Sequence, residues 1–301
     1  MLARVSGLVR YRSPEEDSGR WLEFPFRRGD IVISTRSKSG TTWMQMICAL
    51  LIFQTADLPA PLAYLSPWLD WLTTPREQVY EQLAAQRHRR FIKTHTPLDG
   101  VPVRPDVSYI VVARHPLDMA VSLYHQGDNI DRERLGRLTD TAPARDSASA
   151  RLPLHAWLMR WIEGDSDPRA ELDSLPGVLW HLTDAWRRRE EPNVRLVHFD
   201  DLLTDLDGQM RRVAAWLDIT VPAERWQPLV QAATFAAMRQ HAEQLVPDIH
   251  GVLKDRQAFF RSGRSGAGRA LLSGEELRRY HERTTQLAAP PDLLAWLNRD
   301  R

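Results

Sequence analysis

The 301-residue sequence predicts one α/β domain with a central, mostly parallel sheet flanked by helices. Short β-branched apolar runs of strand length alternate along the chain with longer helical patterns. This alternation is typical of parallel strands that are joined by helical crossovers. The sequence has no internal repeat and no linker-like change of composition, so a single domain over residues 1–301 is expected.

Four apolar runs are the expected strands. Residues 107–113 form the clearest one, because the run VSYIVVA is continuous and β-branched, as in a central strand of a parallel sheet. The other three runs cover residues 30–35, 90–94 and 194–199. A turn signal, Gly29-Asp30, precedes the first of them.

Helices are expected between these strands. The apolar run over residues 41–54 is too long for a strand and predicts a core helix. Mixed polar and apolar patterns predict helices over residues 75–88 and 116–125, and Pro75 suits the first helical position.

The C-terminal part ends in two predicted helices. Ser273 and Glu276 have the spacing of a capping box, which predicts a helix that runs to about residue 287. Pro290 and Pro291 end that helix, and a short final helix is expected after them.

Two segments lack a regular pattern. Residues 128–151 are polar and rich in Ala, Ser, Arg and Asp, which predicts a mobile surface insertion. Residues 256–274 are rich in Gly, Ser and Arg and predict a loop.

The composition is that of an ordinary globular protein, with 43% hydrophobic and 26% charged residues. The net charge of +1 excludes a general attraction to nucleic acid or anionic membrane, so any anion site must be local. The single cysteine, Cys48, excludes an internal disulfide and a cysteine metal site and favours a reducing compartment. Residues 1–20 lack a secretory signal, and no run approaches about 18 apolar residues, so a cytoplasmic protein without a membrane span is expected.

The segment KSGTTW, residues 38–43, predicts a phosphate-binding turn. It lies between an expected strand and an expected helix, where a helix start offers unpaired backbone N–H groups to an anion. Lys38 adds a full charge, Thr41 and Thr42 add hydroxyl groups, and Trp43 offers a flat face to a purine. The turn is P-loop-like but is not a Walker A loop, because its lysine precedes Gly40. A capped helix with an incidental lysine is the alternative.

The second candidate segment is FIKTH, residues 91–95. It places Lys93 and His95 at the carboxyl end of an expected strand, which is where open α/β sheets bind their ligands. A histidine there is suited to general base catalysis, since its pKa lies near neutral pH. A histidine that only binds loop backbone is an equal alternative.

The third and fourth segments suit a second phosphate. Arg114 ends the clearest strand and Ser122 follows two helical turns later, although a local ion pair of Arg114 with Asp118 is an alternative. Residues 261–266 (RSGRSG) combine arginines with glycines in a loop that could wrap a phosphate, or could be only a solvated basic loop.

These four segments, in this order, resemble those of the cytosolic sulfotransferases, which use 3′-phosphoadenosine 5′-phosphosulfate (PAPS). The likeness covers the chain from Ser37 to Gly266. The stretch FIKTHTPLDG and residues 66–70 are similar to the actinobacterial glycolipid sulfotransferases in particular. The resemblance implies a P-loop-like nucleotide-binding architecture, with PAPS as co-substrate and its desulfated form, PAP, as product.

The resemblance also implies residue roles. His95 would be the catalytic base, Lys38 would stabilise the leaving group, and Lys93 would lie near the transferring sulfuryl group. The remaining implied contacts are with the nucleotide: Ser39, Gly40, Thr41 and Thr42 on the 5′-phosphate, Trp43 on adenine, Phe235 and Met238 beside the nucleotide, and Arg114, Ser122, Arg261, Ser262 and Gly263 on the 3′-phosphate.

The chain departs from the family pattern in three places. Phe199 stands where the family often has a tyrosine, so a hydrogen bond to adenine would be lost. After Gly266 the family often continues Asp-Trp-Lys, whereas this chain continues Ala-Gly-Arg, so the implied closure of this loop does not carry over. The dimerisation motif of the animal enzymes is not recognisable, and the oligomeric state stays open.

The implied reaction is in-line transfer of a sulfuryl group to a hydroxyl group, with no catalytic metal. The alternatives are a P-loop-type kinase, for which Asp200 or Asp201 would bind Mg²⁺, and a non-catalytic nucleotide-binding protein. The sequence leaves the acceptor open between small molecules and lipid-linked sugars. Tyr64, Leu65, Trp68 and Trp71, with the segment after Gln126, could line its entrance, and core packing of these aromatic residues is an equal alternative.

Overall fold

The computed structural model describes residues 7–141 and 151–299. Four strands, β1 (Ile31–Thr35), β2 (Phe91–Thr94), β3 (Ser108–Ala113) and β4 (Val194–His198), form one sheet in the order β2-β1-β3-β4. Every neighbouring pair is parallel, and Ile33 of β1 is in register with Lys93 on one side and Ile110 on the other. The expected mostly parallel α/β sheet is therefore confirmed.

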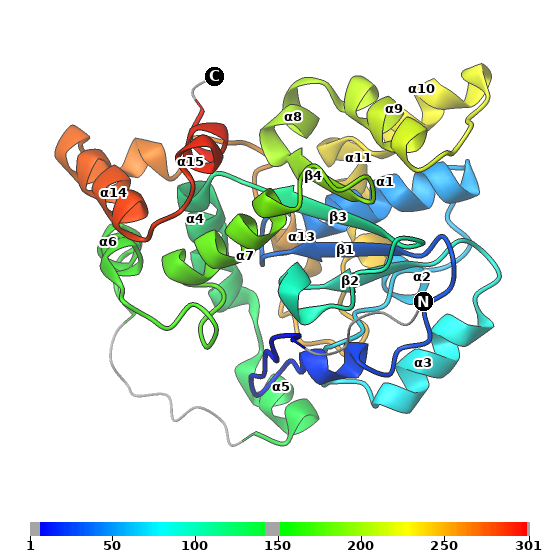
Figure 1. Cartoon of the computed structure of the whole chain (residues 1–301), viewed down its shortest axis with the longest axis horizontal. Helices are drawn as coiled ribbons and strands as arrows, with labels where there is room; N and C mark the ends of the chain where they lie inside the picture. Colours follow the sequence, from blue (N-terminus) through cyan, green and yellow to red (C-terminus); the bar gives the residue numbers. More distant parts are fainter. Residues whose placement is uncertain (1–6, 142–150, 300–301) are drawn as a thin grey trace.

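Helices cover both faces of the sheet (Figure 1). In the first half of the chain they are η1 (Ser18–Trp21), α1 (Thr41–Phe53), α2 (Leu62–Leu65), α3 (Arg76–Ala85), η2 (Leu98–Gly100), α4 (Pro116–Asn129) and α5 (Arg132–Thr139). In the second half they are α6 (Leu154–Glu163), α7 (Leu175–Arg187), α8 (Phe199–Thr204), α9 (Leu206–Trp216), α10 (Ala223–Ala232), α11 (Phe235–Gln240), α12 (Ala242–Leu245), α13 (Arg256–Phe259), η3 (Arg269–Leu271), α14 (Gly274–Gln286) and α15 (Pro291–Leu297).

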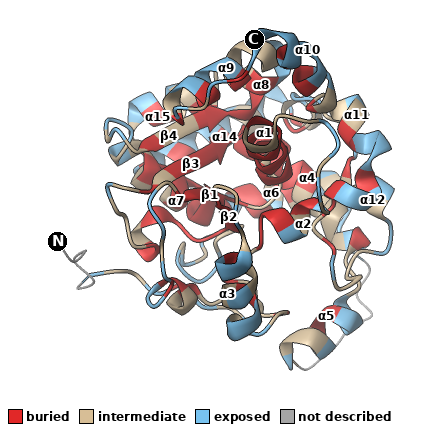
Figure 2. Ribbon diagram, turned by 90° about the vertical axis from the view of Figure 1, so that its right-hand side faces the viewer, coloured by how far each residue is buried: buried red, intermediate tan, exposed pale blue. Residues whose placement is uncertain are grey.

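Alternate strand residues point to two separate cores, because successive side chains of a strand face opposite sides. Ile31 and Ile33 pack with α1 and the α8–α12 region, whereas Val32 packs with α4, α6, α7 and α15. Helix α1 is buried along most of its length (Figure 2). Burial on both faces explains why the strands are continuous apolar runs rather than alternating ones.

The predicted elements agree with the structure apart from local boundaries. Pro75 is the N-cap of α3 rather than its first helical residue, and Phe199 begins α8 because β4 ends at His198. The capping box of Ser273 and Glu276 is present as predicted.

The expected insertion over residues 128–151 contains helix structure that its composition did not predict. Helix α4 continues to Asn129, and α5 follows, with the carboxylate of Asp131 accepting a hydrogen bond from the Arg134 N–H at 2.9 Å. Leu135 of α5 is buried. The predicted mobility is untested, and residues 142–150 of this segment lie outside the described residues. The expected loop over 256–274 likewise contains α13 and η3.

The parallel arrangement brings the carboxyl ends of all four strands to one edge. Strand β1 has β2 on one side and β3 on the other, so the chain leaves β1 and β3 toward opposite sides of the sheet. The crevice at such a point is the usual ligand site of open α/β folds. The segments that follow β1, β2 and β3 begin with Arg36, His95 and Arg114.

A buried ion pair fixes the opposite, amino-terminal ends of β1 and β2. Arg90 donates to Asp30 through Nε at 2.8 Å, and Asp30 and Arg90 are 1% and 2% exposed. The Arg90 guanidinium also donates to the Pro25 carbonyl at 2.9 Å and lies over the Phe24 ring.

We predict that Arg90→Met lowers the free energy of unfolding by about 3–5 kcal/mol, because it leaves the Asp30 carboxylate buried without its partner. Arg137→Ala, which removes an exposed pair with Glu133 on α5, should cost less than about 1 kcal/mol. Urea denaturation of both variants measures the difference. Equal losses would show that the buried pair does not hold these strand ends.

Candidate active site

A cavity of about 370 Å³ lies at the carboxyl edge of the sheet. Ser39 is the one residue predicted for catalysis or nucleotide binding that does not line it; this residue is buried, and its N–H donates to the Arg36 carbonyl at 3.2 Å. The predicted residues that line the cavity come from distant parts of the chain: Lys38, Gly40, Thr41, Thr42, Trp43, Lys93, His95, Arg114, Ser122, Phe235, Met238, Arg261, Ser262 and Gly263.

The loop between β1 and α1 presents the helix start to this cavity. Lys38 and Gly40 both have positive φ angles, 62° and 113°. A Cβ on Gly40 would lie 3.0 Å from the Phe199 ring and 3.3 Å from Val112, so a larger residue would be strained there and crowded as well. Gly40 is the N-cap of α1 and no side chain caps this end. The first N–H groups of the helix and its positive dipole end are therefore available to an anion.

Thr41 and Thr42 both bring a hydroxyl group to the cavity, and that of Thr41 has a fixed position. The Thr41 hydroxyl is hydrogen-bonded to the hydroxyl of Thr35 at the end of β1, which fixes its position. Thr41 and Thr42 are 6% and 7% exposed, and both line the cavity.

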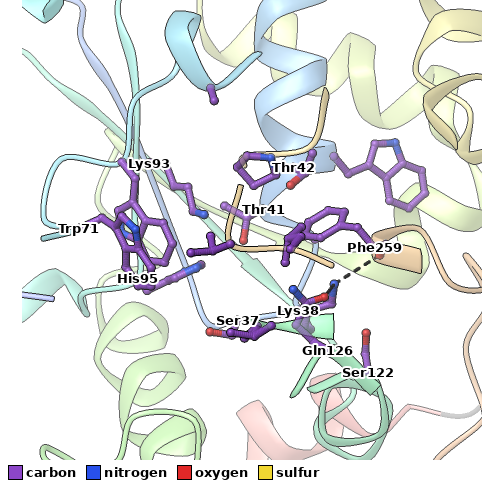
Figure 3. Close-up of a pocket in the computed structure, with 18 of the residues that line it drawn as sticks. Ser37, Lys38, Thr41, Thr42, Trp71, Lys93, His95, Ser122, Gln126 and Phe259 are labelled. Carbon is purple, nitrogen blue, oxygen red and sulfur yellow. Dashed lines mark hydrogen bonds between the residues drawn. The ribbon is translucent and has the colours of Figure 1, made fainter. Parts of the chain in front are cut away.

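Lys38 points across the cavity toward α4 and α13 (Figure 3). Its Nζ lies 3.2 Å from Oε1 of Gln126, 3.4 Å from the Phe259 carbonyl oxygen and 3.9 Å from the centre of the Phe259 ring. Each of these partners is uncharged. The ammonium group therefore has no carboxylate partner among the described residues.

Five cationic side chains line the cavity, namely Arg132 and a group of four that act on one another: Lys38, Lys93, Arg114 and Arg261. Burial is the main reason that the pKa of Lys38 falls to about 7, and the charges of the other three lower it further. Because removal from water and like charges both disfavour the ammonium form, a bound anion would raise this pKa again.

Arg114 is held at the end of β3 over the Phe199 ring, 4.3 Å from its centre. Its guanidinium donates to the Lys38 carbonyl at 3.2 Å and the Arg264 carbonyl at 2.9 Å. Arg114 thus connects the loop between β1 and α1 to the loop over residues 261–268, which we call the late loop. Ser122 of α4 lines the same part of the cavity and is 8% exposed.

Asp118 forms hydrogen bonds with the late loop and not an ion pair with Arg114. Its carboxylate accepts hydrogen bonds from the N–H groups of Gly266 at 2.7 Å and Gly268 at 2.8 Å. Ser265 donates its hydroxyl proton to Asp200. The alternative of an Arg114–Asp118 pair is therefore wrong for this structure. Two carboxylates anchor the loop at the position where the family pattern has a tryptophan.

An aromatic slot joins two cationic regions of the cavity, one around Lys38 at the start of α1 and the other around Arg114 and Arg261. Trp43 donates its Nε1 proton to the Ala233 carbonyl at 2.8 Å and meets the Phe199 ring edge-on, with 5.2 Å between ring centres. Phe235 and Met238 of α11 line the same cavity. Gly263 has a φ of 59° and passes against the Phe235 ring, so a side chain there would collide with it.

His95 has a defined tautomer. Its Nδ1 lies 2.5 Å from the Thr35 carbonyl oxygen, which can only accept, so Nδ1 carries the proton and Nε2 has a free lone pair. Burial, followed by the charges of Lys93 and Arg36, holds the pKa of His95 well below its usual value. The imidazole is therefore neutral and able to accept a proton at physiological pH.

Lys93 and His95 both contact Trp68, and Figure 3 shows their side chains near that of Trp71. Its Nζ is 3.6 Å from the centre of the Trp68 ring, and Trp68 stacks on Trp71 with 4.0 Å between ring centres. Burial lowers the pKa of Lys93 to about 7, although the negative charges of Glu16 and Asp70 oppose this effect.

Of the four residues predicted for the acceptor entrance, two line the cavity and two do not. Trp68 and Trp71 line the cavity, whereas Leu65 is a core residue that is 6% exposed. Tyr64 is 50% exposed and does not line the cavity. Predicting it there was wrong, because α2 directs successive side chains away from each other.

Several lining residues were not predicted. Gln126 and Phe259 contact Lys38, and Glu16 brings a carboxyl group to the cavity from the N-terminal segment. Only the fold shows these contacts, since each residue is far along the chain from its partner. The acidic pair Glu15-Glu16 in a turn-rich segment was a visible signal, but surface turns often carry such pairs.

No group of three or more potential metal ligands occurs within residues 7–141 and 151–299. In the same part of the chain, no helix is both long and apolar enough to cross a membrane.

Residues 28–289 match the family model described as sulfotransferase domain. The chain belongs to the sulfotransferase family. A glycolipid sulfotransferase of Mycobacterium bovis is 40% identical over 312 residues, which cover 97% of this chain and 95% of that protein. Sulfotransferase 1A1 of Canis lupus familiaris is 25% identical over 271 residues, with 86% and 83% covered.

Solved structures share the fold of this sulfotransferase. Retinol dehydratase, in complex with androsterone and inactive cofactor PAP, has a TM-score of 0.68 at 22% identity, with 89% of this chain and 83% of that chain covered. Mouse sulfotransferase SULT7A1, complexed with PAP, also has a TM-score of 0.68, at 19% identity and 93% and 90% coverage. The family match confirms the sulfotransferase prediction over the kinase alternative.

We predict that Asp118→Ala loosens the late loop of the sulfotransferase, because two backbone N–H groups lose a charged acceptor. Trypsin should then cut after Arg261 and Arg264 at least about tenfold faster than in the wild type. Asp207→Ala, which removes an exposed carboxylate paired with Arg211 on α9, is the control and should change nothing. Equal cleavage of all three proteins would contradict the anchoring role of Asp118.

Proposed function

We propose that this sulfotransferase moves a sulfuryl group from PAPS to a hydroxyl group of a glycolipid acceptor, with His95 as the general base. One observation carries the proposal. A neutral imidazole with a free Nε2 lines the same cavity as an uncapped helix start and five cationic side chains. A proton acceptor on one side and an anion site on the other are the two requirements of transfer from a phosphosulfate to a hydroxyl group.

The donor would span the cavity between the two cationic regions. Its 5′-phosphosulfate would occupy the start of α1 beside Lys38, and its 3′-phosphate would occupy the region of Arg114, Ser122 and residues 261–263. Adenine would enter the slot between Trp43 and Phe235. The PAP complexes of the two structural neighbours support this assignment.

Transfer would begin when His95 Nε2 accepts the proton of the acceptor hydroxyl. The hydroxyl oxygen then forms a bond to sulfur while the bond from sulfur to the 5′-phosphate oxygen breaks. Negative charge grows on that leaving oxygen, where Lys38 and the N–H groups of α1 stabilise it. Lys93, next to His95, would stabilise the sulfuryl oxygens.

The acceptor class rests on the relative and on the cavity wall. The relative from M. bovis is described as a glycolipid sulfotransferase. Part of the cavity wall is apolar, with Ile130 and Leu135 from the α4–α5 region and Ile249, Val252 and Leu253 beside them, although Arg132 and His250 of the same two segments also line it. Such a wall suits the alkyl part of a lipid. The predicted cytoplasmic location remains a prediction, supported by the single cysteine.

The test of the proposal is a transfer assay with the purified protein, radiolabelled PAPS and a panel of glycolipids and simple alcohols. The wild type should produce a sulfated glycolipid. His95→Ala should lower kcat by about a thousandfold or more, because it removes the proposed proton acceptor.

PAP binding to His95→Ala should remain within about threefold of wild type by calorimetry, since His95 lies on the acceptor side. His241→Ala, at an exposed position between α11 and α12, is the matched control. A protein that binds PAP but sulfates no member of the panel would be a nucleotide-binding protein instead. Full activity of His95→Ala would exclude His95 as the base.

We also predict that PAP binding takes up protons. The pKa of Lys38 is about 7 in the free protein, so near about pH 8 most of the side chain is neutral. A bound phosphate raises this pKa, and Lys38 must then gain a proton. The affinity should therefore fall as the pH rises through about 7, and the uptake should vanish well below that pH.

Calorimetry in two buffers of different ionisation enthalpy measures this uptake. Lys38→Met should reduce it and weaken PAP binding, whereas Lys254→Met, outside the cavity, should do neither. Proton release, or uptake that is unchanged in Lys38→Met, would show that Lys38 is already charged before the nucleotide binds.

A further inference from the structure

A second cavity, of about 690 Å³, adjoins the first on its acceptor side. Four residues line both cavities, namely Glu15, Glu16, Leu123 and Asp173, so the two spaces meet along one short boundary. We call the second cavity the polar chamber. Its walls come from the N-terminal segment, α6 and the loop before α7, and its volume is ample for a sugar ring or a disaccharide.

The polar chamber is lined by groups of both signs. Four arginines and four acidic side chains line it, and one of the acids, Glu16, is mostly uncharged near neutral pH, so the net charge of the wall is small. In this respect it differs from the nucleotide cavity, where cationic groups gather. A wall with many donors and acceptors and little net charge suits a neutral ligand that carries several hydroxyl groups.

Several of these polar groups are free to bind. Arg160 is exposed on α6, and its side chain has no hydrogen bond or ion pair with any described residue. The ring of Trp157, which is half-buried, forms part of the same wall. Aromatic rings beside charged side chains are well suited to sugars, which have both apolar C–H faces and hydroxyl groups.

Glu16 occupies the boundary between the two cavities. Its backbone pairs with Trp71 in an isolated β-bridge, and the Glu16 N–H donates to the Ser13 hydroxyl at 3.0 Å. The carboxyl group is half-buried and makes no hydrogen bond or ion pair within residues 7–141 and 151–299. It nevertheless lies near enough to Lys93 and Arg36 for their charges to affect it.

An ion pair of the buried Arg36 with the partly exposed Asp173 connects the chamber to the proposed catalytic base. Arg36 is 4% exposed; it donates to Asp173 at 2.6 Å and also to the carbonyl of His95. Asp173 and Arg36 both line the polar chamber. Arg36 therefore links the wall of the chamber directly to His95, the residue that would accept the proton.

We propose that the polar chamber is a carbohydrate subsite for the sugar part of the acceptor, and that Glu16 is the residue that selects sugar-bearing acceptors over simple alcohols. This inference rests on the proposed function. The sugar occupies the chamber while one of its hydroxyl groups reaches His95, and the alkyl part follows the apolar wall of the first cavity. Glu16 binds a neighbouring sugar hydroxyl at the boundary.

The protonation state of Glu16 agrees with this role. Burial, with the negative charges of Asp70 and Asp173, raises its pKa to about 8, although Arg36 opposes the shift. Near neutral pH the group is therefore mostly an uncharged carboxyl, which both donates and accepts a hydrogen bond. A glutamine has the same two capacities, so Glu16→Gln is the conservative variant and Glu16→Leu the disruptive one.

The experiment compares kcat/KM for n-octyl β-D-glucoside and 1-octanol, a pair that differs only by the sugar, with PAPS saturating. The wild type should prefer the glucoside by at least about tenfold. Glu16→Leu should lower that preference about tenfold, mainly through KM for the glucoside, and Glu16→Gln should keep most of it.

Arg160→Ala, at an exposed position where folding is not at risk, should also lower the preference for the glucoside. Glu190→Gln, 88% exposed and outside both cavities, is the control.

Two outcomes separate this inference from the function on which it rests. Transfer to both compounds with a preference that is unchanged in Glu16→Leu and in Arg160→Ala overturns the carbohydrate subsite and leaves the sulfotransferase proposal intact. Absence of any transfer from PAPS by the wild type overturns both.

Discussion

The active site depends on like charges being held close together in a buried cavity. Lys38, Lys93, Arg114 and Arg261 line it, and most of their hydrogen-bond and ring partners are backbone carbonyls, aromatic rings and an amide. Burial and mutual repulsion both disfavour the charged forms of such a group. A bound polyanion would relieve this penalty, so the arrangement favours a doubly phosphorylated nucleotide.

The sheet makes this arrangement possible. All four strands are parallel, and the residues after β1, β2 and β3 are therefore delivered to one edge. Local sequence was enough to predict these strands, since a strand buried on both faces must be continuously apolar. The same reasoning predicted the helix start at Gly40 and the positions of His95 and Arg114, because each residue directly follows a strong apolar run.

Other parts of the site could not be read from local patterns. Helix α5 is short and mostly polar, and its place is set by packing of Leu135 and by the contact of Ile130 with Leu253 far along the chain. Asp118 was interpreted as a neighbour of Arg114, whereas the fold uses it to anchor a loop about 150 positions later in the sequence. Glu16 gave only the signal of a surface turn. In each case the decisive partner is remote in sequence, and a single sequence does not show such pairs.

The hydrogen bond from His95 to the Thr35 carbonyl has a consequence for how this family can diversify. Thr35 ends β1, and the loop that receives the phosphate begins with the next residue. The proposed proton acceptor, which follows β2, is thus tied to the end of the neighbouring strand that leads into the proposed phosphate loop, so the sheet maintains their spacing. The walls of the polar chamber come instead from the N-terminal segment, α6 and a loop, none of which belongs to the sheet. Substitutions in those peripheral walls can exchange one acceptor for another while the reacting atoms keep their separation, so new specificities can arise without rebuilding the chemistry.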